Sequence, residues 1–276
     1  NPQVVVVNRP GAGSLNAVNS LYNLAPRDGT AIATGHRFVP LMPLLGMPGA
    51  QFDAMRMNYI GSLSQEVGVC IVRADSGFSG IEDMRAREVV IGTTGAGAEL
   101  TTLARTITRM LDLKFKVVKG YKASTDIDLA IERGELHGRC GVSYGSLRRL
   151  RDDWLRSGKV RIVLQLALAR IPELPDVPAL GELVSGDDRS ALQILLAPAV
   201  IARPIFAPPD VPRERIDELR RAFDTSVTDP ALIAEADKGK LDLSPKSGKE
   251  MEELLRSVYQ VSPAALALAR LLVNDD

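Results

Sequence analysis

Residues 89–111, with the sequence VVIGTTGAGAELTTLARTITRML, decide the fold class because three structural signals follow one another in them. Val89–Thr93 is rich in β-branched residues and predicts a strand. Thr94-Gly-Ala-Gly97 predicts a tight loop, and Glu99–Leu111 has the spacing of an amphipathic helix. Such a turn presents free backbone N–H groups and the positive end of a helix dipole to an anion.

The same order of signals occurs once more, near the start of the chain. Val4–Asn8 predicts a strand, Arg9-Pro-Gly-Ala-Gly13 a glycine loop, and Leu15–Leu24 a helix. One glycine turn of this kind is common in structural roles alone. Two of them, one in each half, favour a ligand that is clamped between two lobes.

The rest of the chain alternates short β-branched runs with longer helical patterns, which is typical of parallel α/β units. Further strands are predicted at Ala31–Thr34, Val67–Arg73, Phe115–Lys119, Leu136–Val142, Val160–Gln165 and Ile194–Ile201. Further helices are predicted at Asp126–Arg133, Arg213–Thr225, Lys249–Tyr259 and Ala264–Val273, and the Asp229-Pro230 pair begins another.

The composition excludes several classes of function. The 34 basic and 34 acidic residues cancel, so no basic field is available to hold nucleic acid or anionic lipid. The apolar runs are too short to cross a bilayer. The strand-like run close to Asn1 shows no secretory signal, which fits a mature exported protein and a cytoplasmic one equally well.

Cys70 and Cys140 are too few and too far apart for a zinc site. Each lies in an apolar, strand-like stretch. They can be two buried thiols that act as small hydrophobic residues, which is the commoner case. A disulfide between them is the alternative, and it would suit an oxidising compartment.

Two motifs suggest enzymes on first sight. Gly11-Ala-Gly13 and Gly95-Ala-Gly97 lack the third glycine and the downstream acid of a dinucleotide-binding turn, so no nucleotide cofactor is expected. Gly141-Val-Ser143-Tyr-Gly145 matches the nucleophile elbow of serine hydrolases. Both histidines, His36 and His137, precede Ser143, whereas the hydrolase order places the histidine last. We therefore expect no catalysis, and a hydrolase using Ser143 stays as the alternative.

Several stretches, taken in order, resemble the substrate-binding receptors of tripartite tricarboxylate transporters, the Bug proteins. The resemblance covers nearly the whole chain. It lies in Val5-Val-Val-Asn-Arg-Pro-Gly-Ala-Gly13, Ala25-Pro-Arg-Asp-Gly-Thr30, Ile91-Gly-Thr-Thr-Gly-Ala-Gly97, Gly120-Tyr-Lys-Ala-Ser124, Glu132-Arg-Gly-Glu135, Ser157-Gly-Lys-Val-Arg161, Leu174-Pro-Asp-Val-Pro178 and Phe206-Ala-Pro-Pro-Asp-Val-Pro212.

This resemblance implies an α/β, two-lobed periplasmic-binding-protein fold of the second structural class, with two strands crossing between the lobes. The crossings are expected near Val67–Val72 and Ala191–Ala207. Lobe one is then formed by residues 1–71 and 200–276, and lobe two by residues 72–199. The first strand, loop and helix that such receptors carry in lobe one are absent from the given sequence, which leaves open that an exposed edge pairs with a second copy.

The resemblance also implies where a ligand carboxylate is held, by helix N-termini, backbone N–H groups and hydroxyls. The small residues and hydroxyls at these positions suit such contacts. The implied ligand-binding residues are Thr34, Gly35, His36 and Arg37 in lobe one, and Thr93, Thr94, Gly95, Ala96, Gly97, Glu99, Ser124 and Ser143 in lobe two.

Two departures from the family concern the choice of ligand. The family usually has an acid or amide where Gly141 and Val142 stand here. Conversely, Glu99 lies in the first turn of the helix that should face the ligand, where its charge suits the helix dipole but repels an anion. Our hypothesis is that Glu99 pairs with Arg37 across the cleft or with a ligand amine.

The sequence therefore predicts a periplasmic solute-binding protein that captures a small organic acid. Its expected partners are the membrane subunits of a tripartite tricarboxylate-type transporter or a sensor protein, with neither a metal nor another cofactor. The second alternative is the ligand-sensing domain of a regulatory system. Aromatic residues make up 4% of the chain, so a compact mono- or dicarboxylate is favoured over a large aromatic ligand.

Overall fold

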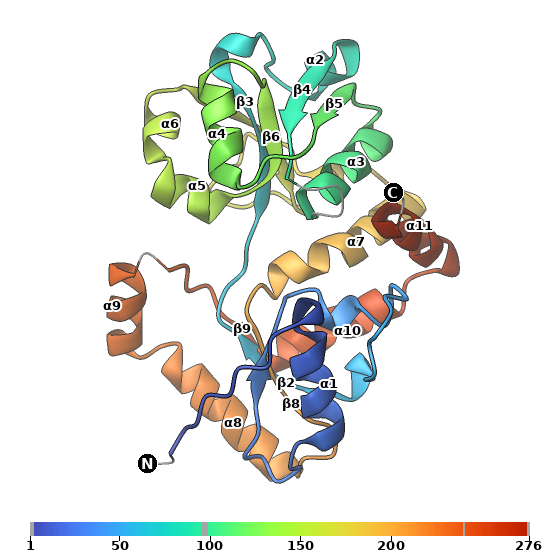
Figure 1. Cartoon of the computed structure of the whole chain (residues 1–276), viewed down its shortest axis with the longest axis vertical. Helices are drawn as coiled ribbons and strands as arrows, with labels where there is room; N and C mark the ends of the chain where they lie inside the picture. Colours follow the sequence, from blue (N-terminus) through green and yellow to red (C-terminus); the bar gives the residue numbers. More distant parts are fainter. Residues whose placement is uncertain (1–2, 95–98, 240, 275–276) are drawn as a thin grey trace. The chain divides into compact units, whose positions relative to one another are not determined.

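The computed structural model describes residues 3–94, 99–239 and 241–274, and it divides into two compact units (Figure 1). Unit 1 comprises residues 1–65 and 197–260, and unit 2 comprises residues 66–196 and 261–276. The division of the chain into lobes and crossing strands that the sequence implied remains a prediction. Among the described residues, no helix is both long and apolar enough to cross a membrane.

Unit 1 is built on a four-stranded antiparallel sheet in the order β1-β8-β2-β9. Its strands are β1 (Ala33–Thr34), β2 (Asn58–Ser62), β8 (Pro204–Ala207) and β9 (Lys246–Ser247), and its helices are α1 (Leu15–Leu24), α8 (Arg213–Ser226), α9 (Pro230–Lys238) and α10 (Gly248–Tyr259). Helix α8 packs closely on β2, because a Cβ atom added to Gly61 would lie 2.2 Å from the Phe223 ring.

Unit 2 contains a five-stranded sheet in the order β5-β4-β6-β3-β7. The strands are β3 (Gly68–Arg73), β4 (Val89–Gly92), β5 (Phe115–Val118), β6 (Gly138–Ser143) and β7 (Val160–Leu166). Strand β4 is parallel to β5 and β6, whereas β3 is antiparallel to β6 and β7. The carboxyl ends of β4, β5 and β6 therefore point to the same edge of the sheet.

Helices cover both faces of the unit 2 sheet (Figure 1). They are α2 (Ile81–Ala86), α3 (Glu99–Leu111), α4 (Ser124–Glu132), α5 (Tyr144–Leu150) and α6 (Asp152–Arg156), together with α7 (Gly186–Val200), which continues into unit 1; α11 (Pro263–Asn274) packs on α3. Along β3, Cys70 and Val72 pack into one core and Val69 and Ile71 into the other. This alternation is that of a sheet buried on both sides.

Two predicted strands are wrong. Val4–Val7 lies outside every strand, and its side chains are 66–82% exposed, since β-branched residues form a strand only when a neighbouring strand pairs with them. Ile194–Ile201 forms the end of α7 instead. A helix that is buried on most sides has the same unbroken apolar run as a buried strand, so the pattern alone does not separate them.

The expected parallel arrangement holds for β4, β5 and β6 only. Unit 1 is antiparallel, and three of its strands, β2, β8 and β9, were not predicted as such. All three are short, and β8 pairs with strands more than a hundred residues away in the sequence. Such pairings leave no local pattern.

Cys70 and Cys140 form a disulfide that joins the neighbouring strands β3 and β6. Both residues are 2% exposed. Of the two hypotheses from the sequence, the structure therefore supports the disulfide over two buried free thiols.

Candidate functional site

The carboxyl edge of the unit 2 sheet brings three of the predicted ligand-binding residues into neighbouring segments. The Thr93 N–H donates to the Val118 carbonyl at 2.9 Å, and the Gly120 N–H donates to the Thr94 carbonyl at 2.8 Å. These bonds hold the end of β4 against the end of β5. Four residues after Gly120 the chain enters α4 at Ser124. Local strand order thus places Thr93, Thr94 and Ser124 at one edge.

Thr93 is fully buried, and its hydroxyl has no hydrogen-bond partner among the described residues. Burying an unpaired hydroxyl is unfavourable by about 1–3 kcal/mol, so most such groups find a partner. The hydroxyl lies at the edge where the family resemblance implies that a ligand carboxylate is held, and a bound polar group there would supply the missing hydrogen-bond partner.

Ser124 is the first residue of α4, and the side chains of Ser124 and Thr125 are exposed. In the described part of the chain, the backbone N–H groups of these two residues meet no acceptor. The Asp126 carboxylate accepts from the Ala123 N–H at 3.1 Å, which fixes the entry into the helix. Two free N–H groups at the positive end of a nine-residue helix can hold a carboxylate.

Ser143 is the last residue of β6, and its Oγ accepts from the Ser146 N–H at 3.3 Å as the N-cap of α5. The two histidines make other bonds. Nδ1 of His137 accepts from the Val90 N–H at 2.9 Å, and Nδ1 of His36 accepts from the Phe38 N–H at 3.3 Å. This geometry gives Ser143 the role of a helix cap and offers no support for a catalytic triad.

For four further residues predicted for lobe two, the structure describes at most the backbone. Gly95, Ala96 and Gly97 lie outside the described residues. For Glu99, the structure describes the backbone, which begins α3, but not the side chain. Its pairing with Arg37 or with a ligand amine stays a prediction.

The four residues predicted for lobe one, Thr34, Gly35, His36 and Arg37, follow one another at the end of β1 in unit 1. The His36 N–H donates to the Ser14 hydroxyl at 3.0 Å. A Cβ atom added to Gly35 would lie 3.2 Å from the Ser14 Cβ, so this turn packs directly on the start of α1. The glycine loop before α1 and the turn after β1 are thus neighbours.

Ser14 was missed by the sequence analysis. It has a left-handed backbone, with φ of 79°, and it directly follows Gly13, with φ of 60°. Its position as the first polar residue after Gly11-Ala-Gly13 is the signal that could have identified it. A polar side chain that ends a glycine loop and begins a helix is a frequent cap or ligand contact.

A buried ionic network connects α4 to β6 and to the start of α6. Nη2 of Arg139 lies 3.0 Å from Oδ1 of Asp128, and the two side chains are 9% and 7% exposed. Nε of Arg151 donates to Oδ2 of Asp128 at 3.3 Å. Burial raises the pKa of Asp128 and outweighs the opposing effect of the two arginines. Burial likewise lowers the pKa of Arg139.

The network continues to the other end of α4. The Trp154 indole N–H donates to Oε1 of Glu132 at 2.9 Å, and the Arg151 guanidinium lies 5.0 Å from the Trp154 ring. Trp154 is 1% exposed. Strand β6 and helix α6 thereby hold both ends of α4.

His137 should make unit 2 less stable in mild acid. Burial lowers its pKa, and the charges of Arg73 and Arg87 lower it further against the opposing charge of Glu88. Its folded pKa thus lies below the unfolded value of about 6.5, so the unfolded chain binds more protons as the pH falls below 6.5. We expect the urea midpoint of unit 2 to drop between pH 7 and pH 5.

His137→Asn is the matched variant for this effect, because the new amide oxygen can still accept from the Val90 N–H but does not titrate. We expect its urea midpoint to depend less on pH between 7 and 5 than that of the wild type. Equal pH dependence of the two proteins would exclude His137 as the source.

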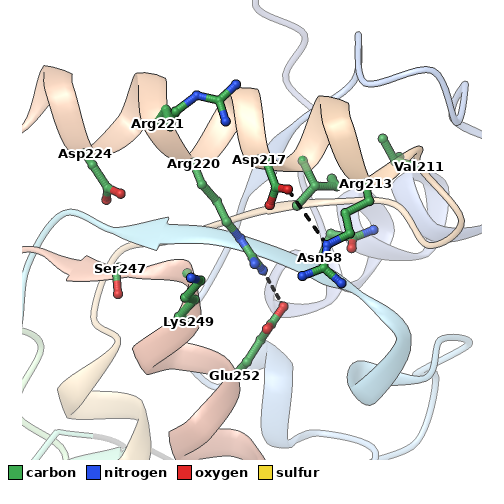
Figure 2. Close-up of a pocket in the computed structure, with 12 residues that line it drawn as sticks. Asn58, Val211, Arg213, Asp217, Arg220, Arg221, Asp224, Ser247, Lys249 and Glu252 are labelled. Atoms are coloured by element: carbon green, nitrogen blue, oxygen red, sulfur yellow. Dashed lines mark hydrogen bonds and ion pairs between the residues drawn. The ribbon is translucent and has the colours of Figure 1, made fainter.

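A surface groove of about 680 Å³ lies in unit 1 between α8 and α10, and none of the predicted ligand-binding residues lines it (Figure 2). Four of its charged side chains form two ion pairs. Nε of Arg220 donates to the Tyr59 carbonyl at 2.9 Å, and the same guanidinium pairs with Glu252. Arg213 lies 3.8 Å from Asp217. The Arg220–Glu252 pair joins α8 to α10, and the hydrogen bond of Arg220 to the Tyr59 carbonyl attaches α8 to β2, so we interpret this groove as a structural surface.

Metal chemistry has no candidate in the described part of the chain, where no three His, Cys, Asp or Glu residues are grouped so that they could hold an ion.

Comparison with known proteins identifies the family. The family described as "Tripartite tricarboxylate transporter family receptor" matches residues 1–261. A UPF0065 protein of Bordetella bronchiseptica is 23% identical over 241 residues, which cover 84% of this chain. The chain spans 65% of the length of that curated relative.

Solved structures share the fold. A TctC solute-binding protein from Polaromonas has a TM-score of 0.74 at 18% identity, covering 99% of this chain and 87% of that one. MatC from Rhodopseudomonas palustris, solved with bound malate, has a TM-score of 0.56 at 16% identity, covering 96% and 85%. A second R. palustris protein, solved with adipate, has a TM-score of 0.57 at 15% identity, covering 92% and 82%.

The structures resemble the chain at identities below 25%, so they establish the periplasmic-binding-protein fold alone. The family match extends over most of the sequence, and it agrees with the residues from which the resemblance was first drawn. The chain therefore belongs to the receptor family of the tripartite tricarboxylate transporters.

Proposed function

We propose that this chain is an extracytoplasmic solute-binding protein that captures a small carboxylate. The observation that carries the proposal is the start of α4 at the carboxyl edge of the unit 2 sheet, where the exposed residues Ser124 and Thr125 have backbone N–H groups that meet no acceptor among the described residues. The Thr93 hydroxyl, which has no hydrogen-bond partner among the described residues, directly follows β4 at the same edge. Membership of the receptor family and the malate and adipate bound to two structural relatives support the same class of ligand.

The disulfide supports a location outside the cytoplasm, because structural disulfides persist mainly in oxidising compartments such as the periplasm.

The proposed partner is the membrane part of a tripartite transporter. The residues Thr34, Gly35, His36 and Arg37 are proposed as the contribution of unit 1, and the division at residues 1–71, 72–199 and 200–276 as the lobes that close on the ligand.

Binding can be tested by thermal shift and calorimetry against malate, adipate and other short carboxylates, with the matching amides as neutral controls. A ligand at about a hundred times its Kd stabilises the protein by about 2.7 kcal/mol, which corresponds to about 5–10 °C for a chain of this size. No shift with any carboxylate would contradict the proposal.

Ser124→Pro tests the site itself. Proline is favourable at the first position of a helix, and Ala123 already has the extended backbone that proline requires of its neighbour, with φ of −144° and ψ of 164°. The variant should keep α4 but lose the Ser124 N–H. A hydrogen bond to a charged group contributes about 1.5–3 kcal/mol, so we expect carboxylate affinity to fall at least about tenfold.

Ser124→Ala is the control, because it removes the hydroxyl and keeps the N–H. We expect Ser124→Ala to lose less affinity than Ser124→Pro when both are titrated by calorimetry. If the two variants bound equally well, the backbone N–H would not be a ligand contact.

A further inference from the structure

Arg139 occupies an unusual place in the sheet. It lies in β6, which has β4 on one side and β3 on the other, and its side chain is more than nine-tenths buried. Its guanidinium extends to α4, where Nη1 lies 3.5 Å from the carbonyl oxygen of Ser124, the first residue of the helix. A buried cation therefore contacts the first turn of α4, whose leading N–H groups meet no acceptor among the described residues.

The Arg139 side chain is incompletely satisfied. Its Nε has no partner among the described residues, and its ion pair with Asp128 at 3.0 Å falls short of hydrogen-bond geometry. A buried pair of this kind is unfavourable to desolvate, and well-packed apolar residues in its place are often as stable or more so. Stability alone therefore does not explain why the strand carries an arginine here.

The contacts of the pair converge on one element. Arg139 reaches Ser124, while Asp128 follows one turn later on the same helix and also binds Arg151. The pair thus fixes the first turn of α4 against β6 from inside the unit.

We propose that Arg139, paired with Asp128, is a positioning residue for carboxylate binding: it holds the first turn of α4 so that the N–H groups of Ser124 and Thr125 keep a fixed aim at the anion. This inference rests on the proposed function and extends it to a residue that does not itself touch the ligand. A binding group held rigidly loses less freedom when the ligand arrives, which favours affinity.

The test uses the double variant Asp128→Asn with Arg139→Met, which removes both charges and leaves no lone buried ion. The amide that replaces the Asp128 carboxylate still offers an oxygen that can accept from Arg151. The matched control removes another Arg–carboxylate pair of unit 2, with Arg170→Met and Glu182→Gln, whose Nε and Oε2 lie 2.9 Å apart. Arg139→Lys serves as the conservative variant.

Two quantities are measured on each protein. The first is amide hydrogen exchange of residues 127–130 without ligand, because their hydrogen bonds close the first turn of α4. The second is the affinity for malate and adipate by calorimetry. In the double variant we expect exchange at least tenfold faster at these residues, affinity at least tenfold lower, and an unchanged urea midpoint for global unfolding.

We expect Arg139→Lys to retain most of the affinity and the control pair to change neither quantity. Unchanged exchange in the double variant would overturn the inference whether or not a ligand is found. Faster exchange with unchanged affinity would overturn it as well. A wild type that binds no carboxylate would instead refute the proposed function, and the role of Arg139 in binding with it, and that case is recognised from the wild-type titration alone.

Discussion

Removing the disulfide between Cys70 and Cys140 is expected to lower the unfolding temperature of unit 2 by about 10 °C. The bond closes a loop with a sequence separation of 70 residues. By the chain-entropy account, closing a loop of this length stabilises the folded state by about 4 kcal/mol. In a domain of roughly 150 residues, each kcal/mol shifts the transition by about 2–4 °C. The double variant Cys70→Ala with Cys140→Ala shows the loss directly.

Scanning calorimetry on the wild type and the double variant, each with and without reductant, measures this effect. Reductant should shift the wild type alone, and slowly, because both cysteines are 2% exposed and the bond must first become accessible. Alkylation and intact mass verify the redox state. A fully reduced wild type that unfolds at the original temperature would contradict the expected stabilisation.

Phe206→Ala is expected to destabilise unit 1 by about 3–5 kcal/mol, the usual loss for a buried phenylalanine. Phe206 is fully buried in β8, and its ring meets that of Tyr59 edge-on at a centroid distance of 6.4 Å. Strand β8 lies between β1 and β2, so the cavity would open in the middle of the sheet. The change should appear in the urea midpoint of unit 1.

Phe206→Leu is the graded control, because it keeps most of the volume and should lose less than about 1.5–2 kcal/mol. Circular dichroism in urea follows both variants. Because Phe206 belongs to unit 1 and unit 2 is a compact unit of its own, the transition of unit 2 should stay within about 0.5 kcal/mol of the wild type. If Phe206→Ala and Phe206→Leu lost the same free energy of unfolding, the neighbouring side chains would have filled the cavity, and the expected cost of the cavity would be contradicted.

Local sequence predicted the elements whose signals are local. The bounds predicted for Leu15–Leu24 and Glu99–Leu111 agree with α1 and α3, because helical spacing and flanking loop residues mark both ends. The strand at Val4–Asn8 failed since pairing, which the sequence does not display, decides whether a β-branched run becomes a strand. Ile194–Ile201 failed because complete burial removes the helical period.

The same distinction applies to the site. Thr93 and Ser124 were predicted from the resemblance to the receptor family, and their role as ligand contacts stays a prediction. Their position at one edge of the sheet follows from strand order, because parallel strands end at the same edge. Arg139 was missed, since it was counted within an apolar strand. A charged residue inside a strand that is predicted to be buried was the available signal, and its partner on α4 could not be inferred from spacing alone.

Trp154 is the only tryptophan of the chain, and it lies in the core of unit 2 with its indole bound to the last residue of α4. Its emission spectrum is therefore a signal from one half of the molecule. Far-ultraviolet dichroism records helices in both halves. When the two optical signals are followed during one unfolding experiment, any delay between them gives the order in which the halves come apart, without a label or a further substitution.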